Sequence, residues 1–389
     1  MTLIAGTHRN FAPDKVVFGR PAAEVVAEET QKRGAERVFL ITSRSLAAGE
    51  LLAGIKAALG ARLAGVFSEM RPHAPRADVV AAAKAARSAG ADLLLAVGGG
   101  SACDGAKAVL VCLWEGVQSE ADLGAFIGSG ARRPSPPKEG ATRMIAVPTL
   151  LSAAEFTAFA GVSDPTRKVK EGLGHPLCLP AAVVLDPAAT LGTPVRLLKT
   201  TGMKAVDHAV EGALSIRPSP LAEAAAVKAL DLLWRGLPGL GGAKDGAELR
   251  QDLQFASWLS IVGAGAGSPV GASHAIGHVL GGLGVAHGET TGVLLPAVLR
   301  WNAPANAERQ KDLLASLGSP ASDLPPDLAT GIADLARRLE VPTRLRDLNL
   351  SRDLLGEIAE KTMAEASLRA NPRKIASADQ VGEILDLAW

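Results

Sequence analysis

DLLLAV at residues 92–97, followed directly by GGGSACDGAK at residues 98–107, is the stretch that decides the predicted fold. Residues 92–97 form a mostly apolar run, typical of a strand buried in a parallel sheet, and a helical pattern follows the glycines. Glycines at such a turn let backbone N–H groups approach a phosphate, and the helix N-terminus adds partial positive charge. The junction predicts a pyrophosphate cradle, with a plain glycine-requiring turn as the alternative. The GxGxxG spacing of an ordinary dinucleotide fingerprint is absent.

Strand and helix patterns alternate on both sides of this junction. An alanine-rich stretch, residues 77–88, predicts a crossover helix, and GARRPSPPKEG at residues 130–140 predicts a surface loop. Repetition of strand, helix and strand indicates a parallel sheet. The other predicted strands are residues 37–42, 61–67, 144–147 and 182–185.

The character of the chain changes after Asp186-Pro187. From Thr193-Pro194 onward, long helical patterns are interrupted only by Pro and Gly breaks. We therefore predict an α/β domain over residues 1–186 and an all-helical domain over residues 187–389. A boundary near Ser135, in the Pro-rich loop, is the alternative.

Composition narrows the function classes. The 389 residues carry 41 basic and 40 acidic side chains in a mixed order, so neither nucleic acid nor an anionic membrane is an expected partner. A small-molecule substrate is favoured. The N-terminus lacks the order of a signal peptide and no apolar run reaches spanning length, so we expect a soluble, cytoplasmic protein. The three cysteines form no CxxC motif and are expected to be buried thiols in a reducing compartment.

Two histidine-bearing segments carry the second chemical pattern, GMKAVDHAVE at residues 202–211 and HAIGH at residues 274–278. On a helix, residues four apart share a face, so Lys204 lies beside His208. The spacing suits a metal site, yet an ammonium has no lone pair to donate. Asp207, three residues from Lys204, is better placed to pair with that ammonium than to complete a metal site.

A third motif, PTLLSAAEFT at residues 148–157, follows the strand predicted at residues 144–147. A turn bearing hydroxyl groups at the carboxyl end of a parallel strand lies where open α/β sheets bind ligands. By itself the motif is equally typical of an ordinary turn at the end of a strand.

Taken in order, these motifs, with Asp186-Pro187 and His287, resemble those of the iron-containing (group III) alcohol dehydrogenase family. The resemblance covers nearly the whole chain, and residues 148–155 are most similar to the maleylacetate reductase branch. Leu150 stands where a second threonine is usual in that branch. The resemblance implies a Rossmann-like N-terminal domain, an all-helical C-terminal domain, a cleft between them that holds NAD(H) or NADP(H), and a homodimer. This is the dehydroquinate synthase-like architecture.

The resemblance also assigns cofactor residues. Where many NAD-dependent members carry an aspartate that binds the adenosine ribose, this chain has Ser43, followed by Arg44. Losing that carboxylate removes a repulsion against a 2′-phosphate, so NADP is permitted as well as NAD. Arg44 could pair with that phosphate, and the alternative is that Arg44 is a solvated surface charge. The remaining implied contacts are Gly98, Gly99, Gly100 and Ser101 at the pyrophosphate, Thr149 and Leu151 towards the nicotinamide, and Lys170 at its ribose. His73, in a loop flanked by prolines, is not included.

In metal-dependent members an aspartate and three histidines hold the ion, and the matching positions here are Lys204, His208, His274 and His287. We therefore expect no metal, as in the maleylacetate reductase branch. The Lys204 ammonium would stabilise negative charge in place of the ion. By its position in the family, His278 is the candidate proton donor, and the other histidines shape the pocket. The alternatives are buried structural histidines and a solvent-facing Lys204 in a protein that has lost catalysis.

The expected activity is reduction of a small oxo-acid by NADH or NADPH, and of maleylacetate to 3-oxoadipate if the resemblance extends to the substrate. One alternative is a metal-dependent alcohol dehydrogenase that uses His208, His274 and His287. The others are a dehydroquinate synthase-like cyclase and a nucleotide-binding protein without catalysis.

Overall fold

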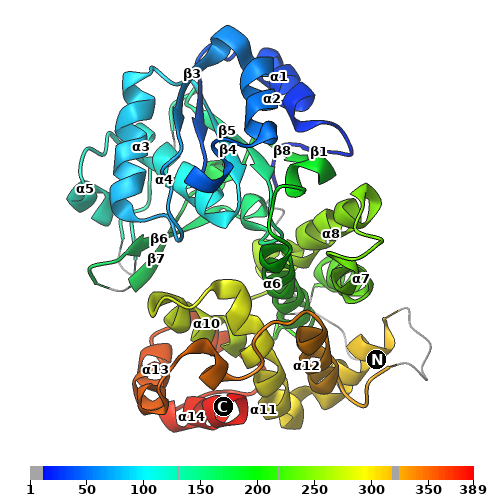
Figure 1. Cartoon of the computed structure of the whole chain (residues 1–389). Helices are drawn as coiled ribbons and strands as arrows, with labels where there is room; N and C mark the ends of the chain where they lie inside the picture. The colour runs from blue at the N-terminus through cyan, green and yellow to red at the C-terminus, as the bar shows by residue number, and fades with distance from the viewer. Residues whose placement is uncertain (1–11, 129–130, 136, 168, 218, 318–323) are drawn as a thin grey trace. The chain divides into compact units, whose positions relative to one another are not determined.

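The structure, a computed structural model, describes residues 12–128, 131–135, 137–167, 169–217, 219–317 and 324–389 (Figure 1). These residues form two compact units, and the division falls between Pro194 and Val195. Each unit has its own secondary structure class, so each is described by itself.

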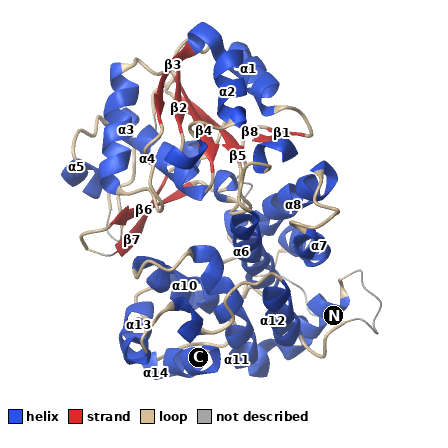
Figure 2. Ribbon diagram, viewed as in Figure 1, coloured by secondary structure: helices blue, strands red, loops and turns tan. Residues whose placement is uncertain are grey.

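The first unit is built on a parallel sheet with the strand order β1-β8-β5-β4-β2-β3 (Figure 2). A separate antiparallel hairpin pairs β6 with β7. The strands are β1 Val16–Phe18, β2 Val38–Ile41, β3 Leu63–Phe67, β4 Leu93–Gly98, β5 Arg143–Pro148, β6 Phe159–Asp164, β7 Val169–Gly174 and β8 Ala182–Leu185.

Helices cover both faces of this sheet (Figure 1). On one face, alternate strand residues such as Val38 and Leu40 pack against α1 (Ala22–Lys32) and α2 (Glu50–Leu59). On the other lie α3 (Arg76–Ser88) and α4 (Gly100–Glu115). A short helix, α5 (Glu120–Gly124), follows α4. Because both faces are buried, β2, β4 and β8 are buried along their whole length, which is why they are apolar throughout.

The predicted strands are all present, and the crossover helix is α3. Three further strands lacked a sequence pattern. β1 has only three residues, and β7, VKEGLG, mixes charges with glycines.

Residues 187–194 belong to the α/β unit, although the boundary predicted from sequence is residue 186. The Thr193 hydroxyl donates to the backbone oxygen of Thr149 at 2.9 Å and holds this segment there. The Pro-rich loop at 130–140 lies partly outside the described residues.

The second unit is helical. A core cluster joins α10, α11, α13 and α14 through buried residues such as Ile276, Leu294 and Ile384. Within α11 the backbone is non-helical at Asn306, two residues after Pro304. The helices are α6 Val195–Ala213, α7 Pro220–Gly236, α8 Ala247–Ser260, α9 Val262–Ala266, α10 Ala272–Gly282, α11 His287–Ala315, α12 Leu328–Arg338, α13 Leu355–Thr362 and α14 Ala378–Ala388. Across the described residues, every helix is too short or too polar to span a membrane.

Candidate active site

One face of α6 carries polar side chains into the interior of the helical unit. Lys204, Asp207, His208 and Glu211 follow the three- and four-residue spacing of a single helix face, and all four are buried. Charged groups are rarely fully buried unless they are paired, so this face requires partners from within the unit.

Lys204 finds its partner on its own helix. Its Nζ lies 2.8 Å from Oδ2 of Asp207, and both side chains are almost entirely enclosed. The hydroxyl of Thr291, on α11, lies 3.4 Å from the same oxygen. Burial would raise the pKa of Asp207, but nearby His274 and Lys204 outweigh burial and hold it below its ordinary value. The pairing predicted from the spacing is therefore confirmed, and Lys204 does not face solvent.

The histidines of α6 and α10 come together. The rings of His208 and His274 are stacked with centroids 5.1 Å apart, and the His278 ring meets that of His274 edge-on at 6.5 Å. His278 is the accessible member, with 43% of its side chain exposed, and its Nδ1 lies 3.1 Å from Oε2 of Glu365. His287 is the first residue of α11, but its side chain lies outside the part of the chain that the structure describes.

Glu211 completes the cluster, and sequence reasoning did not assign it. Its Oε2 lies 2.6 Å from Nδ1 of His274, while Asp207 Oδ2 lies 3.3 Å from the same nitrogen. The available pattern was its place three residues after His208 and four after Asp207, on the same helix face. That spacing could not reveal its partner on another helix.

Burial decides the charge of these groups. It lowers the pKa of His274 to about 3, although Asp207 acts in the opposite direction. Burial and the Lys204 ammonium also place the pKa of His208 well below its ordinary value. Burial and the Asp207 carboxylate raise the pKa of Glu211 to about 8. The hydrogen bonds that Glu211 accepts from backbone N–H groups act in the opposite direction. At neutral pH both buried histidines are therefore uncharged, and Lys204 and Asp207 form the cluster's ion pair.

Two donor sets for a divalent metal can be compared with this geometry. The aspartate and three histidines implied by the resemblance do not fit, because an ammonium occupies the aspartate position. A different group, Asp207, Glu211 and His274, has donor atoms within 4.8 Å of one another and could hold an ion. Two ligands of one ion lie more than about 3 Å apart, since each bond is about 2.1 Å long. The 2.6 Å contact between Glu211 and His274 is instead a hydrogen bond.

In the α/β unit, the glycine turn lies at a switch in strand order. From β2 the chain leads to the edge strand β3, whereas from β4 it leads to β5 on the opposite side. Ligands of open α/β sheets bind outside the carboxyl ends of strands at such a point. Ser43 follows β2, and Gly99 is the N-cap of α4, which begins immediately after β4. The predicted strand-to-helix turn is therefore confirmed at the place where this class of sheet binds nucleotides.

The turn has little room for side chains. Gly98 has φ of 145°, a conformation that favours glycine, and a Cβ on Gly99 would lie 2.3 Å from Cδ1 of Leu150. The first N–H groups of α4 have no partner within the helix, so they can face a phosphate. The turn therefore fits the pyrophosphate of a dinucleotide, and Gly98, Gly99, Gly100 and Ser101 would hold it.

The loop before α3 lies against this turn. The backbone N–H of His73 donates to Oγ of Ser101 at 2.9 Å, and both His73 and Ala74 have left-handed backbone conformations. Such conformations cost about 1–3 kcal/mol each and occur often at functional sites. Burial and the nearby Lys170 ammonium lower the pKa of His73. His73 thus touches a predicted cofactor residue, a contact that its loop sequence did not indicate.

The other predicted cofactor residues differ in their exposure. Thr149 and Leu151 are buried, with 2% and 1% exposure. Lys170 lies on β7, and its side chain passes over Gly161. Ser43 Oγ lies 3.0 Å from Ser45 Oγ, and neighbouring Arg44 pairs with Glu69.

Lys107, at the end of the glycine motif, has a structural role. Its ammonium is fully buried and donates to the backbone oxygens of Ala154 at 2.6 Å and Phe159 at 2.7 Å. Asp104, one turn earlier, accepts from the N–H of Gly161 at 3.1 Å. Together they fasten the segment after β5 and the start of β6 to α4.

Two features together define a nucleotide-dependent oxidoreductase architecture. The α/β unit has a glycine turn at a switch in strand order, and the helical unit has a histidine cluster. The sequence model for iron-containing alcohol dehydrogenase matches residues 13–187, and the model for the C-terminal part of the Fe-containing alcohol dehydrogenase family matches residues 199–389. The chain belongs to the iron-containing alcohol dehydrogenase family, whose members are NAD(P)-dependent oxidoreductases. The cyclase and non-catalytic alternatives are therefore set aside.

Relatives with different activities are about equally similar to this chain in sequence. Maleylacetate reductase of Rhizobium sp. (strain MTP-10005) is 32% identical over 91% of this chain and 90% of the relative. The 4-hydroxybutyrate dehydrogenase of Cupriavidus necator is 31% identical over 92% of this chain and 94% of the relative. Among solved structures, a 1,3-propanediol oxidoreductase aligns with a TM-score of 0.87 at 26% identity, covering 100% of both chains. The maleylacetate reductase of Agrobacterium tumefaciens aligns with a TM-score of 0.81 at 28% identity, over 100% of this chain and 99% of that chain.

Proposed function

We propose that this protein is an NAD(P)H-dependent reductase of small oxo-acids, with maleylacetate as the first substrate to test, and that it works without a divalent metal. The observation that carries the proposal is the buried pair of Lys204 and Asp207 beside His208 and His274. An ammonium stands where the family's metal-dependent members hold an anionic ligand.

The proposed reaction adds a hydride and a proton to maleylacetate, giving 3-oxoadipate and the oxidised cofactor. The reduced nicotinamide supplies the hydride. Hydride addition to a carbon conjugated with a carbonyl leaves negative charge on the carbonyl oxygen, which needs a positive partner. One N–H of Lys204 faces Asp207, and an ammonium carries three donors, so the same group can also donate to that oxygen.

The proton is proposed to come from His278. Of the three histidines in this cluster whose side chains are described, His278 is exposed, while His208 and His274 are buried and uncharged near neutral pH. Glu365, at 3.1 Å from Nδ1, can orient the ring. Substrate carboxylates suit a cluster with a cationic group, which favours an oxo-acid over a neutral alcohol.

A second candidate is a metal-dependent alcohol dehydrogenase. The grouping of Asp207, Glu211 and His274 favours it, since carboxylates and imidazole are common ligands of divalent metals. It requires the hydrogen bond between Glu211 and His274 to open, and the ion would compete with Lys204 for Asp207.

The deciding experiment combines metal analysis with a substrate screen. Purified protein is assayed with maleylacetate, and in the oxidative direction with 4-hydroxybutyrate and 1,3-propanediol, using both cofactors with and without chelator. Turnover of maleylacetate unaffected by chelation is expected. A requirement for stoichiometric iron or zinc would overturn the metal-free proposal, and preference for 1,3-propanediol would overturn the oxo-acid assignment.

A matched pair of variants tests Lys204 itself. Lys204→Met removes the ammonium and keeps the length of the side chain, whereas Lys199→Met does the same elsewhere on α6. Loss of an electrostatic donor in an enclosed site costs about 10²–10³-fold in kcat, so this loss is expected only for Lys204→Met. Equal activity of the two variants would remove Lys204 from the mechanism.

A further inference from the structure

Glu211 makes a set of contacts that the proposed reaction does not use. Its Oε2 accepts from the backbone N–H of Gly271 at 2.8 Å, and its Oε1 accepts from that of Ser273 at 2.9 Å. Both amides belong to the first turn of α10, where N–H groups have no partner within the helix. A side chain from α6 therefore caps the helix that carries His274.

The same carboxyl group also holds the ring of His274. With Glu211 Oε2 at 2.6 Å and Asp207 Oδ2 at 3.3 Å, two carboxyl groups face Nδ1. The opposite nitrogen, Nε2, is buried and has no hydrogen-bond partner among the described residues. Nε2 is therefore the nitrogen of this ring that remains for a further partner.

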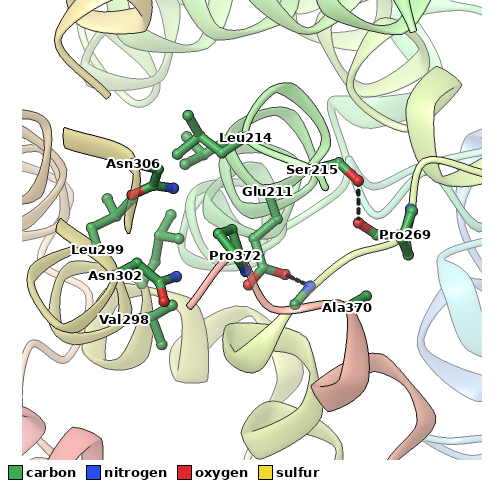
Figure 3. Close-up of a pocket in the computed structure, with 13 residues that line it drawn as sticks. Glu211, Leu214, Ser215, Pro269, Val298, Leu299, Asn302, Asn306, Ala370 and Pro372 are labelled. Carbon is green, nitrogen blue, oxygen red and sulfur yellow. Dashed lines mark hydrogen bonds between the residues drawn. The ribbon is translucent and has the colours of Figure 1, made fainter. Parts of the chain in front are cut away.

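On its other side, Glu211 borders a small cavity. Figure 3 shows it beside Leu214, Pro269 and Asn302, with the hydrogen bond from Gly271 drawn. The space amounts to about 10 Å³, close to the minimum for one water molecule. No oxo-acid fits there, so the cavity offers Glu211 no direct contact with substrate.

We infer that Glu211 is a positioning residue: it holds His274 by Nδ1, so that Nε2 is directed towards the reacting substrate, and it ties that ring to the start of α10. The inference deepens the proposed function and rests on it for the kinetic test. The ring contact itself is tested without turnover.

Asn371 provides a matched control. Its Oδ1 accepts from the N–H of Ala272 at 3.2 Å and from Asn302 at 3.1 Å. It thus caps the same turn of α10 as Glu211, while its side-chain hydrogen bonds join Ala272, Asn302 and Arg373 rather than His274. A purely structural role for Glu211 predicts equal effects of Glu211→Ala and Asn371→Ala.

The kinetic experiment measures kcat and KM for both variants and for Glu211→Gln, which preserves an acceptor oxygen. Misplacement by about 1 Å of a ring that faces the substrate costs about 10²-fold, so Glu211→Ala should lose this much kcat with an unchanged KM for the cofactor. Glu211→Gln should lose about tenfold in kcat and Asn371→Ala less than about threefold, although the loss of either cap lowers Tm. If Glu211→Ala does not fold, the kcat of Glu211→Gln is compared with that of Asn371→Ala instead. Wild-type kcat in Glu211→Gln, or an equal loss in Asn371→Ala, would overturn the inference.

The second experiment uses protein labelled with ¹⁵N-histidine, which has only seven histidines. A short hydrogen bond at Nδ1 of His274 should give a proton resonance far downfield, assigned by its loss in His274→Gln. This resonance should move or vanish in Glu211→Gln and persist in Asn371→Ala. An unchanged resonance in Glu211→Gln would overturn the inference. A wild-type protein that shows the contact but reduces no oxo-acid would overturn only the proposed function.

Discussion

Lys204 Nζ and Asp207 Oδ2 lie 2.8 Å apart in the interior of the helical unit, one turn apart on α6. In water such a pair contributes little, but an enclosed pair that loses one partner leaves an uncompensated charge at a cost of about 3–5 kcal/mol. The pair therefore fixes an ammonium beside the histidines of a family whose metal-dependent members hold an ion at this position. Whether the cluster of Lys204 and the histidines binds a divalent metal depends on this contact.

Lys204→Asp should create affinity for a divalent metal. The change removes an ammonium and adds a carboxylate, which restores the family's aspartate position, and Kd for Zn²⁺ or Fe²⁺ should fall by more than about tenfold. Isothermal titration should detect this, and the metal should raise Tm because it binds the folded state. Lys199→Asp, on the same helix, should show no such gain. Unchanged metal affinity in Lys204→Asp would mean that the other ligands are not arranged for an ion.

His278→Gln should slow the chemical step. General acid catalysis contributes about 10²–10⁴-fold, so kcat should fall within that range while KM for the cofactor stays the same. His175→Gln, in the α/β unit where the ring packs against Trp114, is the control and should keep wild-type kcat. A kcat for His278→Gln within about threefold of wild type would assign the proton to another donor.

Gly99→Ala should disturb the glycine turn, because its Cβ would lie 2.3 Å from Cδ1 of Leu150. Because Cδ1 ends a half-buried side chain that can turn away, the loss of stability should lie near the lower end of the about 1–3 kcal/mol typical of overpacking, and KM for NADH and NADPH should rise. Leu150→Ala should relieve the contact, so the double variant should recover stability in urea unfolding. Strictly additive effects of the two changes would show that Leu150 is not the obstacle.

Ser43→Asp should shift the cofactor preference towards NADH. A carboxylate after β2 would repel a 2′-phosphate, and about 1.4 kcal/mol of repulsion changes kcat/KM for NADPH about tenfold. Ser45→Asp, at the residue whose Oγ lies 3.0 Å from that of Ser43, is the matched control for local charge. The measurement is the ratio of kcat/KM for NADH to kcat/KM for NADPH. Equal ratios in the two variants would show that Ser43 is not the residue that lies beside the adenosine ribose.

The pH dependence of stability should carry the signature of Glu155. Burial raises the pKa of this carboxyl from 4.5 to about 7. The folded state then binds the proton more tightly than the unfolded state, so stability is full below pH 4.5 and falls as pH rises to 7. Relative to Glu155→Gln, the wild type should lose up to about 3 kcal/mol of unfolding free energy over this window. Urea unfolding at several pH values gives the difference, and a constant difference would contradict the prediction.

Glu29 is a control of opposite sign. Burial pushes its pKa up, but the ammonium groups of Lys15 and Lys32 outweigh burial and lower the pKa. Its contribution to stability is therefore present above pH 4.5 and lost as pH falls through the lowered value. Relative to Glu29→Gln, the wild type should thus weaken towards acid pH.

Much of the fold could be predicted because its causes are local. Residues 182–185 are apolar throughout and are the strand β8, since a strand covered on both faces needs no polar alternation. The pairing of Lys204 with Asp207 also follows from the sequence, because residues three apart share a helix face. By contrast, β7 carries charges and glycines, so it has no strand pattern and depends on its partner β6.

By itself, the sequence determined the α/β and helical classes, the glycine turn and the pairing of Lys204 with Asp207, all features of residues near one another in the chain. Only the tertiary structure decided that Glu211 holds His274, that Leu150 fills the space above Gly99, and that Lys107 fastens the segment after β5. The physical reason is that each of these contacts joins different segments of the chain. Periodicity shows which face a side chain occupies, but the partner that it meets depends on how helices and strands pack.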